Sequence, residues 1–116
     1  SHFNTENVTN TNTMFFSCDA LTSLNLSSFK LEKVTDMGSM FFACEEMKTI
    51  YCDYAWKCAE STSMFSYCSK LKGVVAYDEN KVDVKMANPE TGYFTKKTVD
   101  GIDKSIDNTD TTIVYK

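Results

Sequence analysis

One motif occurs three times in the first 76 residues, and this repetition constrains the fold more than any other feature of the chain. The copies are MFFSCDALTSL (14–24), MFFACEEMKTI (40–50) and MFSYCSKLKGV (64–74). The first two lie 26 residues apart and the third follows after 24, so two residues are missing between the motifs. Stacked repeats tolerate such a deletion in a loop, and periods of about 20–29 residues are typical of leucine-rich-repeat solenoids.

Each repeat combines two hydrophobic periods. In the first, the apolar residues are spaced as on one face of a short helix of about two turns: Met14, Phe15, Cys18 and Leu21. Leu24 and Leu26 then alternate with polar residues, which predicts a short, half-buried strand. We therefore expect an α/β repeat solenoid over residues 3–76, with short parallel strands, short helical turns and three stacked turns of 24–26 residues.

Two segments follow the repeats. Residues 77–95 lose the period, and we expect them to form a C-terminal cap with Tyr93 and Phe94 as its hydrophobic plug. Residues 96–116 place KKTVDGI and TTIVYK around a polar stretch, which is typical of a hairpin or of the start of another module. The first repeat begins directly at Phe3, so we expect further repeats upstream.

Composition argues against several classes of function. The net charge is −4, the isoelectric point is about 4.9 and all basic residues are lysine, which disfavours nucleic acid as a partner. His2 is the only histidine, so catalytic triads and histidine metal sites lack their central group. No segment has the roughly 18 consecutive apolar residues of a membrane span. We expect no enzymatic activity, no cofactor, no metal and no direct membrane insertion.

The segments FNTENVTNTNTMFFSCDALTSLNLSS (3–28) and FKLEKVTDMGSMFFACEEMKTI (29–50) resemble the BspA-like leucine-rich-repeat surface proteins. MANPETGYFTKK (86–97) resembles the segment that closes the repeats of that family, so the resemblance covers residues 3 to about 96. It implies a secreted protein of the bacterial cell surface whose leader and anchor lie outside this sequence. Known partners in the family are host matrix proteins or other microbes, while most members have no assigned role. The resemblance carries no binding residues.

Phe16 and Phe42 depart from that family, which has small polar residues after the Met-Phe pair. Both lie two residues beyond the motif methionine, so we expect their rings to lean outward and to stack one repeat apart. Such an exposed apolar strip is typical of a contact with a partner, or of weak self-association. The alternative is a rotated helical turn that buries both rings.

The strands supply a second candidate surface. Its outward residues are expected to be Ser23, Asn25, Ser27, Thr49, Tyr51, Asp53, Gly73 and Val75. Tyr51 is a candidate binding anchor between Asn25 and Asp53. The alternative is that Tyr51 pairs with Val75 across neighbouring strands and binds nothing.

The five cysteines fall into two groups. Cys18, Cys44 and Cys68 share one repeat position, which predicts a column of buried free thiols rather than a zinc site or disulfides. Cys52 and Cys58 align with interior positions, which favours burial, but a disulfide closing the shortened loop is an open alternative.

Together these features predict a non-enzymatic protein-binding repeat of a bacterial cell-surface protein, acting in adhesion. The candidate partner-binding residues are Phe16, Phe42, Tyr51, Asn25 and Asp53. The alternative is a structural spacer or stalk segment without a ligand of its own. A contiguous aromatic patch on the surface favours the first hypothesis, and a uniformly polar surface favours the second.

Overall fold

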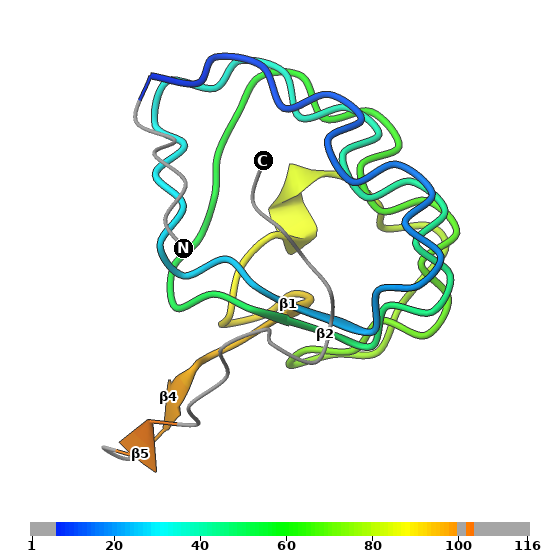
Figure 1. The fold of residues 1–116 in the computed structure, drawn as a ribbon, viewed down its shortest axis with the longest axis vertical. Helices are drawn as coiled ribbons and strands as arrows, with labels where there is room; N and C mark the ends of the chain where they lie inside the picture. Colours follow the sequence, from blue (N-terminus) through cyan, green and yellow to red (C-terminus); the bar gives the residue numbers. More distant parts are fainter. Residues whose placement is uncertain (1–6, 100–101, 104–116) are drawn as a thin grey trace.

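The first two repeats place their alternating segments side by side as parallel strands. The computed structural model describes residues 7–99 and 102–103. A parallel sheet forms in the order β1-β2-β3 from β1 (Ser23–Asn25), β2 (Thr49–Tyr51) and β3 (Phe94–Thr95). Successive turns of the chain lie over one another, with this sheet along one side (Figure 1). The arrangement agrees with the coarse prediction of a repeat-like fold with short parallel strands.

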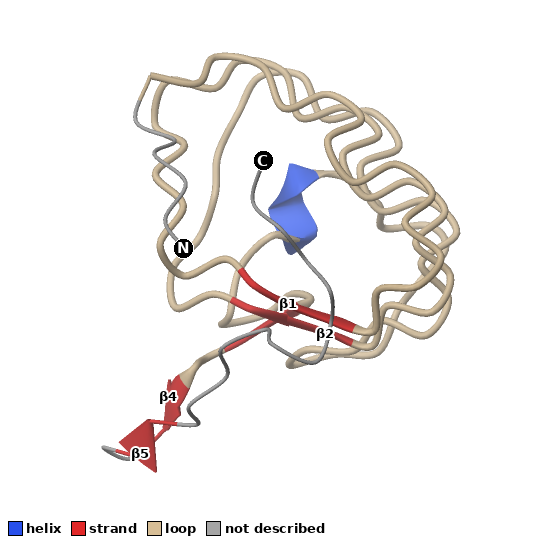
Figure 2. Ribbon diagram, in the orientation of Figure 1, coloured by secondary structure: helices blue, strands red, loops and turns tan. Residues whose placement is uncertain are grey.

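The helical turns that the sequence predicts do not form. Within the described residues the only helix is η1, a 3-10 helix at Val84–Met86 (Figure 2). After each motif methionine the amide groups instead alternate in direction. The Phe16 N–H donates to the carbonyl of Thr13 in its own turn (3.1 Å), whereas the Phe15 N–H donates to the carbonyl of Met40 in the next turn (2.8 Å). An α-helix directs its amides along its own axis, so it cannot supply these lateral bonds.

Residues with a left-handed backbone accompany this alternation. They recur at equivalent positions with φ between 51° and 66°, namely Thr13, Ser17, Ser39, Ala43, Ser63 and Tyr67. A side chain in this conformation costs roughly 1–2 kcal/mol, because the Cβ atom approaches the following carbonyl oxygen. The lateral hydrogen bonds between turns offset this cost, since each buried amide that finds a partner avoids a comparable penalty.

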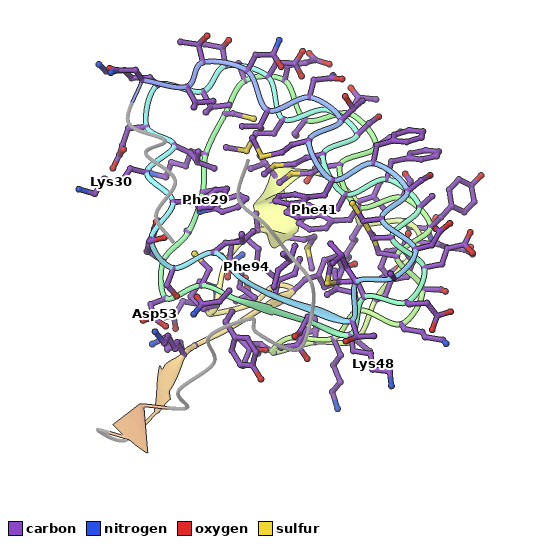
Figure 3. All side chains as sticks on the ribbon, in the orientation of Figure 1. Phe29, Lys30, Phe41, Lys48, Asp53 and Phe94 are labelled. Atoms are coloured by element: carbon purple, nitrogen blue, oxygen red, sulfur yellow. The ribbon has the colours of Figure 1, made fainter. Side chains whose placement is uncertain are left out.

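The interior consists of columns of equivalent side chains. Phe15, Phe41 and Phe65 stack in successive turns with ring centroids 5.5 Å and 5.3 Å apart and nearly parallel planes. Phe29, Phe41 and Phe94 point into the interior, whereas Lys30 and Lys48 point away from it (Figure 3). Burying one such phenylalanine contributes roughly 1.5–3 kcal/mol, so the columns supply much of the stabilisation of the stacked turns.

The third strand does not come from the third repeat, which corrects the prediction that the segment with Gly73 and Val75 continues the strand face. Val75 is exposed as predicted, but it lies outside the sheet. The sequence aligns Val74 with the interior residue Ile50, but Val74 is 53% exposed. β3 takes its place, with Phe94 opposite Ile50. The chain at Gly73 passes so close to the segment before β3 that a Cβ atom on Gly73 would overlap the backbone of Tyr93. Only a glycine at this position permits such a close approach.

The segment before β3 is held by Tyr93, which is fully buried as predicted, together with Phe94. The Tyr93 ring meets Phe65 edge-on at 5.3 Å, and its hydroxyl donates to the carbonyl of Lys81 (2.7 Å). β4 (Thr98–Val99) and β5 (Ile102–Asp103) then form a short antiparallel pair. TTIVYK (111–116), predicted as part of a hairpin, lies outside the described residues.

Candidate binding surface

Three aromatic side chains form a strip on the outside of the turns. Phe16 and Phe42 stack with ring centroids 5.1 Å apart and planes within 5°. Tyr67 meets Phe42 edge-on at 5.3 Å. Phe16 is 48% exposed, Tyr67 is 63% exposed and Phe42 is half-buried between them. We call Phe16, Phe42 and Tyr67 the aromatic strip. The first two rings stack outside the core, as the first of the two predicted alternatives requires.

Tyr67 is the member of the aromatic strip that sequence reasoning missed. The repeat alignment places Ser66 opposite Phe16 and Phe42, and places Tyr67 opposite Ala43. The Tyr67 backbone has a φ of 66°, and its N–H donates to the hydroxyl of Tyr77 (3.0 Å). This conformation is unfavourable for a bulky residue. The tyrosine in the run MFSYC, where the other copies have small residues, is the signal that could have found it.

Acidic residues follow the aromatic strip in the sequence. Asp19 and Glu45 lie three residues after Phe16 and Phe42, and both are exposed. Neither has an ion-pair partner within the described part of the chain. The next carboxylate, Glu46, is paired with Lys70 at 2.8 Å in the neighbouring turn, and hydrogen bonding to Lys70 lowers the pKa of Glu46. The carboxylates of Asp19 and Glu45 therefore remain unpaired beside the aromatic strip.

The strand-face candidates Tyr51, Asn25 and Asp53 each make different contacts. Tyr51 lies opposite Asn25 on one side and Thr95 on the other, so the predicted pairing of Tyr51 with Val75 is wrong. β3 occupies the position that Val75 was expected to fill. The Asn25 side chain accepts a hydrogen bond from the Ser27 N–H (3.1 Å). The Asp53 carboxylate accepts one from the backbone N–H of Lys97 (2.6 Å), which ties the chain after β3 to the end of β2.

The thiols of the repeat position form the predicted column. Cys44 and Cys68 are fully buried, and their Sγ atoms donate to the carbonyls of Phe15 and Phe41 in the preceding turns (2.9 Å each). Cys18, at the first turn, is half-buried. Burial raises the pKa of Cys44 and of Cys68 to about 12. A thiol with such a pKa is almost entirely protonated at neutral pH and reacts slowly as a nucleophile.

Cys52 and Cys58 are both free, so no disulfide closes the shortened loop in this structure. Cys52 is buried and donates to the carbonyl of Tyr54 (3.4 Å), whereas the half-buried Cys58 donates to that of Glu60 (3.1 Å). Burial raises the pKa of Cys52 to about 11. The simpler of the two predicted alternatives, burial without a bridge, therefore describes Cys52 well and Cys58 in part.

A hollow of about 250 Å³ lies beside the shortened loop, between Leu31, Glu32 and the segment 54–57. The indole N–H of Trp56 is buried next to it and has no hydrogen-bond partner in the described structure. This hollow contains none of the residues of the aromatic strip. In residues 7–99 and 102–103 no three acidic, histidine or cysteine side chains come together as a metal site, and no helix is long and apolar enough to cross a membrane.

One family of known proteins matches this chain. A family model described as "Mycoplasma protein of unknown function, DUF285" matches residues 1–78. That family is related to the BspA-like proteins that the sequence resembles. Comparison with curated proteins and with solved structures finds no match.

Proposed function

The chain belongs to the family described as Mycoplasma protein of unknown function, DUF285, and from this premise we propose that it is a non-enzymatic protein-binding repeat of a bacterial cell-surface protein. Its stacked turns would form a leucine-rich-repeat-like solenoid that acts in adhesion to host or microbial proteins. The cell-surface location and the adhesive role are supported by the resemblance to BspA-like proteins. The choice of binding over a passive role is supported by the surface of the molecule.

The aromatic strip is the observation that carries this proposal. Three large rings gather on one outer face while equivalent rings already fill the interior column, so the strip is not needed for the core. Exposed clusters of apolar side chains are unfavourable in water, and in soluble proteins they commonly mark contacts with partners. Tyrosine and tryptophan are also enriched among residues that dominate binding energy. The strand-face residues have less support, because Asp53 is engaged in a structural hydrogen bond.

Binding to immobilised collagen, laminin and fibronectin tests the proposal. We expect the protein to bind at least one of them. The variant Phe16→Ser/Phe42→Ser/Tyr67→Ser, called the strip variant, should lose about tenfold or more in affinity, because aromatic anchors buried in an interface contribute about 2 kcal/mol each. Val74→Ser/Val75→Ser is the matched control, because both valines are exposed hydrophobic residues outside the strip. Circular dichroism of each variant verifies that the fold is retained.

Two results would contradict the proposal. One is equal affinity of the strip variant and the native protein for the matrix protein that binds. The other is the absence of binding to all three, which favours the alternative function of a spacer segment that holds other domains away from the cell surface.

A further inference from the structure

We propose that the aromatic strip and the unpaired carboxylates of Asp19 and Glu45 together bind a short, extended, cationic peptide segment of the protein partner. This inference rests on the proposed function and specifies the chemistry of its ligand. It depends on three properties of the surface: the orientation of the rings, the small area that they expose and the sign of the charge beside them.

The orientation of the rings decides which chemistry they can contact. Phe16 and Phe42 lie face to face, so each ring covers one face of the other, and Tyr67 meets Phe42 edge-on. A sugar ring stacks on an exposed aromatic face, and the strip has no row of such faces. The surfaces outside this stack are the ring edges, the second face of Phe16 and the ring of Tyr67, which is the most exposed of the three. These surfaces suit aliphatic side chains, and a cation can lie over the tyrosine face.

The exposed area is too small for two folded proteins to associate through the strip alone. With about 200 Å² per aromatic side chain, the exposed fractions of Phe16 (48%) and Tyr67 (63%) amount to roughly 200–250 Å². A stable interface between folded proteins buries about 800 Å² on each partner. A second copy of this chain is therefore disfavoured as the partner. A short peptide segment, which needs only a few side-chain contacts, matches this area.

The charge beside the strip selects a cationic segment. The Cα atoms of Asp19 and Glu45 lie within about 11 Å of those of Phe16 and Phe42, because three residues cannot span more. Asp19 and Glu45 are also equivalent residues of neighbouring turns, so their like charges repel each other. A lysine or arginine side chain placed between them relieves this repulsion and gains two ion pairs. An acidic peptide meets repulsion from both carboxylates.

The size and exposure of the Tyr67 side chain support a binding role for this residue. A tyrosine with a φ of 66° is strained, whereas the equivalent Ala43 and Ser17 place small side chains in the same conformation. The ring gains little packing in return, since it remains 63% exposed. A large exposed ring, at a repeat position that elsewhere holds a small side chain, is typical of residues that contact a partner.

Fluorescence anisotropy with a labelled decapeptide tests the inference. The peptide has lysine at every second position, with leucine and threonine between the lysines. Peptides with glutamine or glutamate in place of lysine are the ligand controls. Asp19→Asn/Glu45→Gln is the test variant of the protein. Glu32→Gln/Glu90→Gln is its matched control, because it removes two exposed carboxylates elsewhere and gives the same net charge.

We expect the lysine peptide to bind at least about tenfold more tightly than the glutamate peptide. Asp19→Asn/Glu45→Gln should weaken binding roughly three- to tenfold, as expected for two exposed ion pairs, and should reduce its dependence on salt. The control variant should bind within about twofold of the native protein, since its charges lie away from the strip. The strip variant should lose binding of the lysine peptide.

Four results would overturn the inference: no binding of the lysine peptide, equal binding of the three peptides, unchanged affinity of Asp19→Asn/Glu45→Gln, or a concentration-dependent dimer that only the strip variant abolishes. A further result would separate this inference from the proposed function. If binding to a matrix protein needs the aromatic strip but neither these carboxylates nor low salt, the cationic character of the ligand is refuted and the proposed function stands.

Discussion

Raising the pH from 8 to 10 is expected to destabilise the folded state through its buried thiols. Burial raises the pKa of Cys44 and Cys68 from 9.0 to about 12, and that of Cys52 from 9.0 to about 11. These thiols therefore stay protonated in the folded protein at pH values where the unfolded chain has begun to ionise. Because the folded-state pKa is the higher one, the stabilisation is complete below about pH 9 and is lost as the pH rises towards 11 to 12.

The size of this effect follows from proton linkage. A difference of one pKa unit corresponds to about 1.4 kcal/mol, and between pH 8 and pH 10 each buried thiol loses about this amount of folding free energy. The three thiols Cys44, Cys52 and Cys68 together account for about 4 kcal/mol. Domains of this size have a free energy of unfolding of about 5–15 kcal/mol, so the loss is a large fraction of the total.

Urea unfolding followed by circular dichroism at pH 8, 9 and 10, with a reductant present, measures this loss. The variant Cys68→Ala is the comparison. It has lower stability at pH 8 because it leaves a small void, but its stability should fall by about 1.4 kcal/mol less between pH 8 and pH 10. Lysine and tyrosine ionisation affects both proteins equally and cancels in this difference. An identical pH dependence of the two proteins would refute the assignment of Cys68 as a buried, protonated thiol.

Three further predictions concern stability. Phe94→Ala should lower the free energy of unfolding by about 3–5 kcal/mol because the ring is fully buried, whereas Val74→Ala should change it by less than about 1 kcal/mol. Equal effects in urea unfolding would contradict the finding that Phe94, and not Val74, packs beside Ile50. Gly73→Ala should cost about 1–3 kcal/mol and lower the melting temperature, because its Cβ atom overlaps the backbone that leads into β3; an unchanged melting temperature would count against that crossing. Ser17→Gly should raise the stability by about 0.5–1 kcal/mol because Ser17 has a φ of 53°, while Ser28→Gly, at an exposed position without a positive φ, should lower it; a loss in both variants would refute the left-handed assignment.

Repetition in the sequence predicts which side chains share an environment. The positions of Phe15, Phe41 and Phe65 identify the interior column, and the shared spacing of Phe16 and Phe42 identifies their stack on the outside. These predictions succeed because residues one repeat apart are neighbours in a stacked chain, whatever the local backbone conformation.

The local backbone could not be predicted in the same way. The apolar spacing of Met14, Phe15, Cys18 and Leu21 fits one face of a helix. It also fits a chain whose amides donate alternately to carbonyls of their own turn and of the next turn. The left-handed residues that distinguish the two are serine, threonine, alanine and tyrosine, so no glycine marks them.

The origin of the third strand is also invisible in the repeat pattern. The segment at 73–75 continues the alignment, and its two valines favour a strand although Gly73 does not. Phe94 takes the position beside Ile50 because the chain returns there after residues 77–92, which is a property of its path in three dimensions. Tyr67 was missed for a related reason, since its ring reaches the strip from the position that follows the aligned one.

The rows of amide bonds between neighbouring turns determine how the molecule responds to mechanical tension. Each row joins only two neighbouring turns, so a turn that detaches from the stack breaks its own row and leaves the rows between the remaining turns intact. Each turn of 26 residues that peels away lengthens the molecule by up to about 90 Å. β3 is the last strand of its sheet, so a pull from the carboxyl side reaches β3 before β2. Turns of this fold can therefore detach one at a time, and each releases its own length of chain.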